Sequence, residues 1–175
     1  MLLNRYFYDS PYNWFNSFNE VLNGMGCTYG GRMGSSNDIA LHTDICTPLA
    51  TAKAWNDIPK QYRENLKEEG NKIWEELVEQ LSPNIIVCSI PQYYLSNLSK
   101  INVGKLQELC SIHDKKGNEP RKKPFVLKKT TIKINDHNVL LVNGPCVNVP
   151  FGSISNDQKR SLGKIILQDY NNYRT

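Results

Sequence analysis

Asp38-Ile-Ala-Leu-His-Thr-Asp-Ile-Cys-Thr-Pro48 is the stretch that decides the expected fold. It begins as a short apolar run, which is typical of a strand buried inside a parallel sheet. The polar residues His42, Thr43 and Asp44 follow at its carboxyl end, before a loop that contains prolines. Open α/β sheets bind their ligands at the carboxyl ends of their strands. The stretch therefore predicts a site built on a strand end, with Asp44 as its principal residue.

Helices are predicted where apolar residues recur at a spacing of three and four. One long helix is expected between Pro59 and Pro83, and the last helix opens with the capping-box pattern Ser155-x-x-Gln158. The other predicted helices cover residues 12–23, 91–98 and 103–112.

Strands alternate with these helices. Asn84 to Ile90 is a second apolar run of strand length, and residues 125–134 and 139–142 flank a predicted hairpin turn at 135–138. The alternation predicts an α/β protein, a three-layer α/β/α sandwich around a central, mostly parallel four-stranded sheet. No repeat, low-complexity tract or linker divides the sequence, so residues 1–175 are expected to form a single domain.

Composition is that of an ordinary globular protein, with 39% hydrophobic and 22% charged residues. No apolar run approaches the roughly 18 residues of a membrane span, and the first residues do not resemble a signal peptide. The five cysteines are scattered and odd in number, which favours reduced thiols over a disulfide framework. These features predict a cytoplasmic protein, and we expect a monomer without membrane contact.

Basic residues are concentrated between Asp114 and Lys133, although the net charge of the chain is only +4. Such a cluster is expected where a protein contacts nucleic-acid phosphates. The alternative is a solvated segment that keeps the protein soluble. The candidate DNA-binding cations are Lys122, Lys123, Lys128 and Lys129.

Three predicted strand ends carry the polar residues of interest. They are His42 to Asp44, then Cys88 with Ser89, and finally the glycine- and proline-rich loop Gly144-Pro-Cys-Val-Asn-Val-Pro-Phe-Gly152. A loop of this kind before a helix can present backbone amides to a ligand, although it can equally be an ordinary connection. The strand order predicts that all three meet at one edge of one sheet.

Taken in order, the segments resemble those of the uracil-DNA glycosylase superfamily over most of the chain. SPYNWFNSFNEVLNGMG (10–26) is similar to the segment that holds the base-stacking aromatic, and IALHTDICTP (39–48) to the strand whose terminal asparagine reads the pyrimidine. LVEQLSPNIIVCSI (77–90) looks like the following helix and strand. LLVNGPCVNVPFGSIS (140–155) stands where the family has its last motif, which grips the phosphate and the sugar–base bond. The similarity is one of order and spacing rather than of identical strings.

The resemblance implies roles for individual residues. Asp44 falls on the base-reading asparagine, Tyr12 falls near the stacking aromatic, and Asn148 falls in the final loop, in place of the usual histidine. His42 and Ser89 are expected to contact the base and Ser153 the DNA. The family's first motif, which positions water, has no clean counterpart. Its remnant would be Asn4, with Asp9 as a second candidate; otherwise the first strand is very short, the gene extends upstream, or catalysis is altered.

A carboxylate at position 44 changes the expected base. An amide can both donate and accept, which suits uracil, whereas an ionised carboxylate only accepts. Facing uracil, Asp44 would place two acceptors together, but facing cytosine it could accept a hydrogen bond from the N4 amino group. We therefore expect a cytosine-type base, and specifically a modified cytosine of foreign DNA such as that of phages. The alternative is that Asp44 caps the turn that follows the strand.

The sequence thus predicts a DNA glycosylase that hydrolyses the N-glycosidic bond of a flipped pyrimidine, without metal or organic cofactor. Cys110 and His113 could bind a metal, but no second pair stands at matching spacing, so no zinc site is expected. A catalytically silent nucleic-acid-binding module on the same scaffold is the alternative function, favoured by the missing first motif. An α/β-hydrolase-like enzyme is a third, but the sequence has no Gly-x-Ser-x-Gly elbow.

Overall fold

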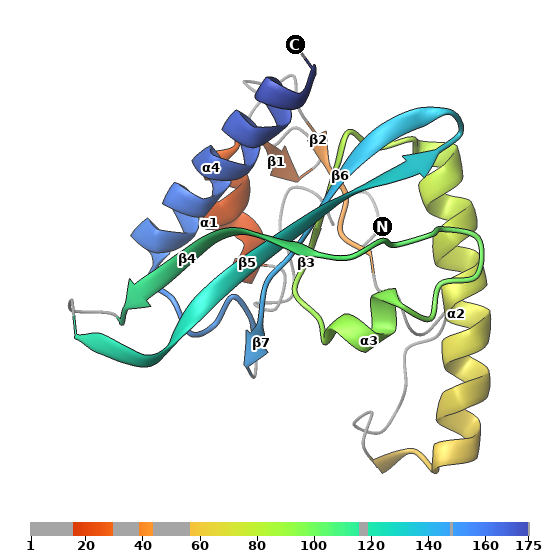
Figure 1. Ribbon diagram of the computed structural model, residues 1–175. Helices are drawn as coiled ribbons and strands as arrows, with labels where there is room; N and C mark the ends of the chain where they lie inside the picture. The colour runs from red at the N-terminus through yellow and green to blue at the C-terminus, as the bar shows by residue number, and fades with distance from the viewer. Residues whose placement is uncertain (1–15, 30–38, 44–56, 116–118, 148, 175) are drawn as a thin grey trace, which may run out of the picture.

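Four strands form the main sheet, in the order β3-β6-β5-β4 (Figure 1). The structure is a computed structural model that describes residues 16–29, 39–43, 57–115, 119–147 and 149–174. The strands of this sheet are β3 (Ile85–Cys88), β4 (Gln107–Asp114), β5 (Pro120–Ile134) and β6 (His137–Asn143). The mixed α/β class and the four-stranded sheet agree with the sequence-based expectation.

The strand directions correct one part of that expectation. β3 and β6 run parallel, but β6 with β5 and β5 with β4 are antiparallel, so the sheet is not mostly parallel. The cause lies partly in the turn between β5 and β6, where Asn135 and Asp136 have φ values of 45° and 67°. Two successive left-handed residues form the short turn that joins antiparallel strands, as the hairpin prediction had indicated.

A second correction concerns residues 103–112, for which a helix was predicted. Most of this segment belongs to β4, which pairs along one side of β5. Cys110 lies opposite Leu127 and Ile112 opposite Phe125, so its apolar residues contact a neighbouring strand rather than one helical face. Pairing with β5 therefore outweighs the local helical spacing.

The strand expected at the start of the opening stretch is short and lies outside the main sheet. Ile39–Ala40 forms β2, which pairs in parallel with β1 (Thr28–Tyr29) in a separate two-stranded sheet. A further small sheet joins β7 (Cys146–Val147) and β8 (Val149–Pro150) within the loop before the last helix.

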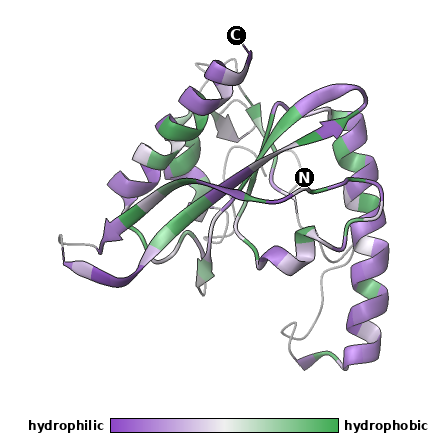
Figure 2. Ribbon diagram, in the orientation of Figure 1, coloured by the Kyte–Doolittle hydropathy of each residue, from purple (hydrophilic) through white to green (hydrophobic). Residues whose placement is uncertain are grey.

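Helices cover both faces of the main sheet. α1 (Asn16–Gly24) and α4 (Asn156–Arg174) lie on one face, and α2 (Lys60–Leu81) lies on the other with the short α3 (Gln92–Leu95) (Figure 1). The predicted helix between the two prolines and the predicted last helix are thereby confirmed. Figure 2 shows α2 as a mainly hydrophilic helix with a few hydrophobic residues along it.

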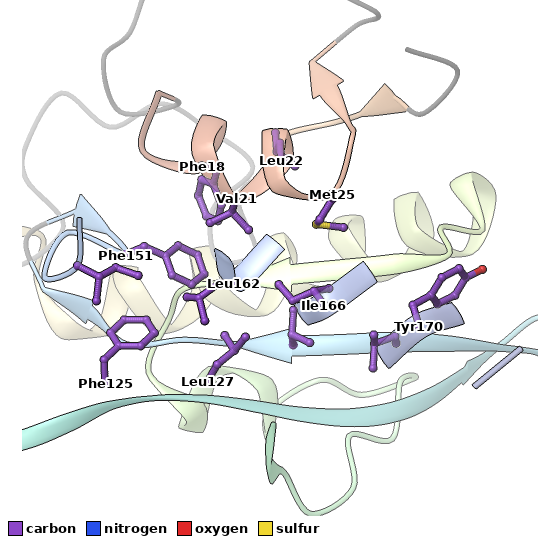
Figure 3. Close-up of a cluster of buried hydrophobic side chains, with 13 residues drawn as sticks. Phe18, Val21, Leu22, Met25, Phe125, Leu127, Phe151, Leu162, Ile166 and Tyr170 are labelled. Carbon is purple, nitrogen blue, oxygen red and sulfur yellow. The ribbon is translucent and has the colours of Figure 1, made fainter. Parts of the chain in front are cut away.

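Strand β6 supplies side chains to two cores because successive residues of a strand point to opposite faces. Leu140 and Val142 pack under α1 and α4, in the cluster drawn in Figure 3. Val139 and Leu141 belong to the second cluster, with Trp74 of α2. All four of these β6 residues are buried. The main sheet is thus apolar on both faces along β6.

Helices α1 and α4 approach each other so closely that their backbones touch. A Cβ atom added at Gly163 would lie 2.0 Å from the carbonyl oxygen of Val21, and one added at Gly24 would lie 2.1 Å from that of Arg160. The Arg160 guanidinium also donates to Glu20 at 2.6 and 3.1 Å. These contacts fix the first described helix against the last.

The start of α4 has the capping box that the sequence predicts. The backbone N–H of Gln158 donates to Ser155 Oγ at 3.2 Å, and the N–H of Ser155 donates to Gln158 Oε1 at 2.9 Å. The box satisfies two amides that a helix start leaves without partners. Across the described ranges, no helix is both long and apolar enough to cross a membrane.

Candidate functional site

The candidate site lies where β3 and β6 end. Because these strands are parallel and in register, with Cys88 opposite Asn143, their carboxyl ends reach the same edge of the sheet. Ser89 follows β3, and Gly144 begins the loop that leads from β6 to α4. We call Ser89, Asn143, Gly144, Phe151 and His42 the strand-end site.

Ser89 connects β3 to the loop that precedes α4. Its Oγ donates to the carbonyl oxygen of Pro145 at 3.0 Å and accepts the backbone N–H of Phe151 at 3.2 Å. The residue is buried. Its single hydroxyl proton is therefore used inside the protein, and a direct contact between Ser89 and a base stays a prediction.

Asn143 is a site residue that the sequence reasoning did not single out. Its Nδ2 donates to the carbonyl oxygen of Ile90 at 3.0 Å, and its Oδ1 accepts the N–H of Ile90 at 3.2 Å. The side-chain amide thus adds a pair of hydrogen bonds between the segments that follow β3 and end β6, just beyond the β3–β6 pairing. An asparagine directly before Gly144-Pro145, at the end of an apolar strand, was the available signal.

Phe151 holds the loop before α4 in an unusual conformation. Its φ is 52°, in the left-handed region that bulky residues rarely adopt, and its side chain is fully buried. The ring lies 5.5 Å from the Phe18 ring and 6.0 Å from the Phe125 ring, centroid to centroid (Figure 3). A Cβ on Gly144 would stand 2.7 Å from this ring, so the loop closes only over a glycine. Surrounding contacts of this kind are what allow a strained backbone to persist.

The end of β2 joins the same site through aromatic contacts. The His42 ring lies edge-on to Phe18 at 5.5 Å between centroids and 6.3 Å from Tyr29. Since Phe18 also touches Phe151, His42 is brought to the loop before α4. Thr43 points elsewhere: its Oγ1 accepts the indole N–H of Trp74 on α2 at 3.0 Å.

Several predicted site residues lie outside the described part of the chain. They are Asn4, Asp9, Tyr12, Asp44 and Asn148. Asp44 directly follows Thr43, and Asn148 lies within the loop that Ser89 closes. Their roles stay predictions.

The predicted DNA-binding lysines are spread over different surfaces. Lys122 and Lys123 are exposed near the start of β5. Lys128 Nζ lies 3.5 Å from Gln92 Oε1 of α3, whereas Lys129 Nζ is paired at 2.5 Å with Asp169 of α4. Lys128 and Lys129 therefore serve opposite faces of the sheet and cannot contact the same phosphates.

Arg121, at the beginning of this basic segment, ties it to the loop before α4. Its guanidinium donates to the carbonyl oxygens of Asp114, at 2.8 Å, and of Ser153. The predicted DNA contact Ser153 is thus next to the basic start of β5, where Lys122 follows Arg121 in the chain.

Four cysteines lie in the described residues, and all are free thiols: Cys27, Cys88, Cys110 and Cys146. Burial raises the pKa of Cys88 to about 12. Partial burial of its sulfur also raises the pKa of Cys146. Cys146 is exposed, in contrast to the other three.

We expect alkylation to distinguish these thiols. At pH 8, iodoacetamide should label Cys146 at least tenfold faster than Cys88, because only an accessible thiolate reacts. Mass spectrometry of peptides after timed quenching measures both rates. Equal labelling rates for Cys146 and Cys88 in the folded protein, without urea, would contradict the shielding of the Cys88 thiol.

The described residues hold no group of three or more His, Cys, Asp or Glu side chains that could bind a metal ion. His113 Nε2 lies 3.1 Å from Ser111 Oγ on β4.

Comparison with known proteins gives no further assignment. No family model, no curated protein and no solved structure matches the chain. The relation to uracil-DNA glycosylases is therefore a resemblance in the order of segments.

Proposed function

We propose that this protein is a DNA glycosylase that releases a flipped pyrimidine, with a modified cytosine as the preferred base. One observation carries the proposal. The ends of β2, β3 and β6 converge through the contacts of His42 with Phe18, Phe18 with Phe151, and Phe151 with Ser89. Carboxyl ends of strands are where sheets of this class bind ligands. In the sequence, Asp44 follows the segment that contains His42, and Asn148 belongs to the loop that contains Phe151.

The proposed reaction is hydrolysis. The target nucleotide leaves the base stack, Tyr12 stacks on the base, and Asp44 accepts a hydrogen bond from its N4 amino group. The bond between C1′ of the sugar and the base nitrogen breaks while positive charge develops on the sugar ring. Water positioned by Asn4 adds to C1′, and its proton ends on the departing base. The products are a free base and an abasic site.

The wider assignment follows from the same resemblance. We take the fold to be a three-layer α/β/α sandwich, which α1 and α4 on one face and α2 on the other support. We place the protein in the cytoplasm as a DNA-binding monomer. Lys122, Lys123 and Ser153 then contact the DNA beside the loop before α4, where Arg121 holds the chain.

Base release tests the proposed function, with DNAs that contain uracil, cytosine, 5-methylcytosine, 5-hydroxymethylcytosine or glucosylated cytosine as substrates. We expect release from one cytosine derivative, at least 100-fold slower in Asp44→Ala, and a shift toward uracil in Asp44→Asn because the amide can also donate. Alkaline cleavage at abasic sites measures the rate for each DNA.

Asp57→Asn is the matched control, since it makes the same change at a described residue outside the strand-end site. It should leave the order of base preference unchanged. Release of no base from any of these DNAs would overturn the enzyme assignment, and an unchanged preference in Asp44→Asn would overturn the role of the carboxylate.

A catalytically silent nucleic-acid-binding module is the second candidate, and a specific observation favours it. The polar groups of Ser89 and Asn143 at the strand-end site already hydrogen-bond to backbone atoms of Pro145, Phe151 and Ile90. Salt-dependent DNA binding without base release would support this alternative.

A further inference from the structure

A small groove lies between the beginning of α2 and α3, on the opposite side of the sheet from α1 and α4. It has a volume of about 130 Å³ and opens to solvent. Ligand sites for whole small molecules are usually about 300–1,000 Å³, so this groove suits one chemical group of a larger ligand. Its lining residues are Lys60, Arg63, Glu64, Lys67, Tyr93 and Tyr94, which we call the α2–α3 groove.

The charge of the groove is positive. Among the described residues that line the groove, Glu64 is the only carboxylate, and it pairs with Lys67 at 2.8 Å. The hydrogen bond from Lys67 lowers the pKa of Glu64, so this carboxylate stays ionised and compensates Lys67. Within the described chain, Lys60 and Arg63 have no ion-pair partner. Two cations of the groove are thus available to an anion.

Arg63 also has a donor without an acceptor. Its Nε atom is buried and makes no hydrogen bond to any described residue. A buried donor left unpaired is costly and rare. A guanidinium is suited to phosphate oxygens, because several of its N–H groups lie in one plane.

Tyr93 adds an accessible aromatic ring beside these cations. Its side chain is 55% exposed, and its ring lies 4.1 Å from that of Tyr94 with an angle of 33° between the planes. Lys67 Nζ lies 6.0 Å from the centre of the Tyr94 ring. Tyr94 thus contacts both Lys67 and Tyr93, and more than half of the Tyr93 side chain is exposed at the edge of the groove.

Proteins that bind single-stranded nucleic acids combine cations with exposed aromatic rings, and the groove has both. The cations follow the phosphates, and bases stack on the ring without regard to sequence. We propose that the α2–α3 groove binds a single-stranded nucleic-acid segment, with a phosphate at Lys60 and Arg63 and a neighbouring base stacked on Tyr93. An acidic peptide would use the cations but has no base to stack on Tyr93.

The position of the groove relates it to the proposed function, on which this inference rests. α3 follows Ser89 closely in the chain, and Gln92 at its start lies beside Lys128. A strand bound in the groove would therefore pass near the strand-end site. The groove would hold the unpaired DNA that surrounds a flipped nucleotide.

Fluorescence anisotropy with labelled dT20 and rU20 tests the cationic part. The double variant Lys60→Gln/Arg63→Gln should bind roughly tenfold or more weakly at 0.1 M salt, and its salt dependence should be shallower by about 0.7 per lost phosphate contact. The double variant Lys72→Gln/Lys164→Gln is the control, because it removes the same charge from exposed lysines outside the groove and outside the basic segment that ends at Lys133.

A second variant tests the stacking part and does not depend on the folding of the first. Tyr93→Leu should weaken binding of dT20 roughly fivefold or more, but should leave binding of an abasic strand of equal length unchanged. Tyr173→Leu is the control, since Tyr173 is similarly exposed, at 52%, on α4. Circular dichroism verifies that each variant is folded.

The outcomes separate this inference from the proposed function. Since dT20 needs no base release, weaker binding in the groove variants supports the groove even when the protein releases no base. If the groove variants bind dT20 and rU20 as tightly as the controls do, the proposal is overturned, whatever the result for base release. The proposal is also overturned if Tyr93→Leu weakens binding of the abasic strand as much as binding of dT20.

Discussion

Replacing Glu75 with alanine is expected to destabilise the protein by about 3–5 kcal/mol, because it leaves three hydrogen-bond donors without a partner. Glu75 is fully buried in the middle of α2. Its Oε1 accepts the backbone N–H groups of Lys100 and Ile101 at 2.7 and 3.1 Å, and its Oε2 accepts the hydroxyl of Ser99 at 2.8 Å. The carboxylate thus fixes the segment that leads into β4.

Glu76→Ala is the matched control for this prediction. Glu76 is the next residue of α2, and its exposed carboxylate pairs with the Nζ of Lys100 at 3.6 Å. Surface pairs of this kind contribute little, so the control should change the free energy of unfolding by less than about 1 kcal/mol. Urea unfolding followed by circular dichroism measures both variants. Equal effects of the two substitutions would show that Glu75 has no special role.

Acid should weaken the stabilising effect of the same carboxylate. Burial alone raises the pKa of Glu75, but its hydrogen bonds with Lys100, Ile101 and Ser99 outweigh burial and hold the pKa below the ordinary value. A group with a lowered folded-state pKa stabilises the protein above its unfolded pKa, about 4.3, and loses this effect as the pH falls through the folded pKa. Between pH 5 and pH 3, Glu75→Gln should therefore lose less stability than the unmodified protein.

Replacing Gly163 with alanine is expected to destabilise the protein by about 2–3 kcal/mol, because the new methyl group would force α1 away from α4. The added Cβ would stand 2.0 Å from the carbonyl oxygen of Val21 and 2.8 Å from the Cα of Gly24. Both neighbours are backbone atoms, so no side-chain rotation can relieve the overlap. The effect opposes helix propensity, which favours alanine over glycine by about 1 kcal/mol.

Gly104→Ala supplies the control for this crossing. A Cβ at Gly104 would meet only Thr130 Oγ1, at an ordinary 3.7 Å. The substitution should be neutral or slightly stabilising, by about 0.4–1 kcal/mol, since it reduces the freedom of the unfolded chain. A Gly163→Ala protein that unfolds at higher urea concentration than the unmodified one would contradict the close contact between the helices.

Local signals in the sequence identified many of the elements. The two prolines bound α2, Ser155 and Gln158 form the predicted capping box, and Asn135 with Asp136 makes the predicted hairpin turn. Each of these features depends on residues close together in the chain. The parallel or antiparallel direction of the strands could not be predicted from such local signals, because it depends on which strands pair with each other.

The features that sequence reasoning missed arise from distant contacts. Residues 103–112 have apolar spacing that suits a helix, and only the pairing with β5 makes the segment a strand. Glu75 is one of several acidic residues of α2, and nothing local indicates that it is buried while Glu76 is exposed. Of the strand-end site, the sequence indicated His42, Ser89 and the loop that begins at Gly144. It did not indicate Asn143, or that Phe151 joins this loop to Phe18 and Phe125.

The contact between α1 and α4 has a consequence for how the chain is made. Arg160 and Glu20, which join the two helices, are 140 residues apart in sequence. Synthesis proceeds at about 5–20 residues per second, so α1 leaves the ribosome roughly 7–30 seconds before its partner exists. During this interval Phe18, Val21 and Leu22 lack the part of their core that α4 supplies, namely Leu162, Ile166 and Tyr170. The contact between α1 and α4 can therefore form only after α4 has been synthesised, and a chaperone that covers α1 until then should raise the yield of folded chains.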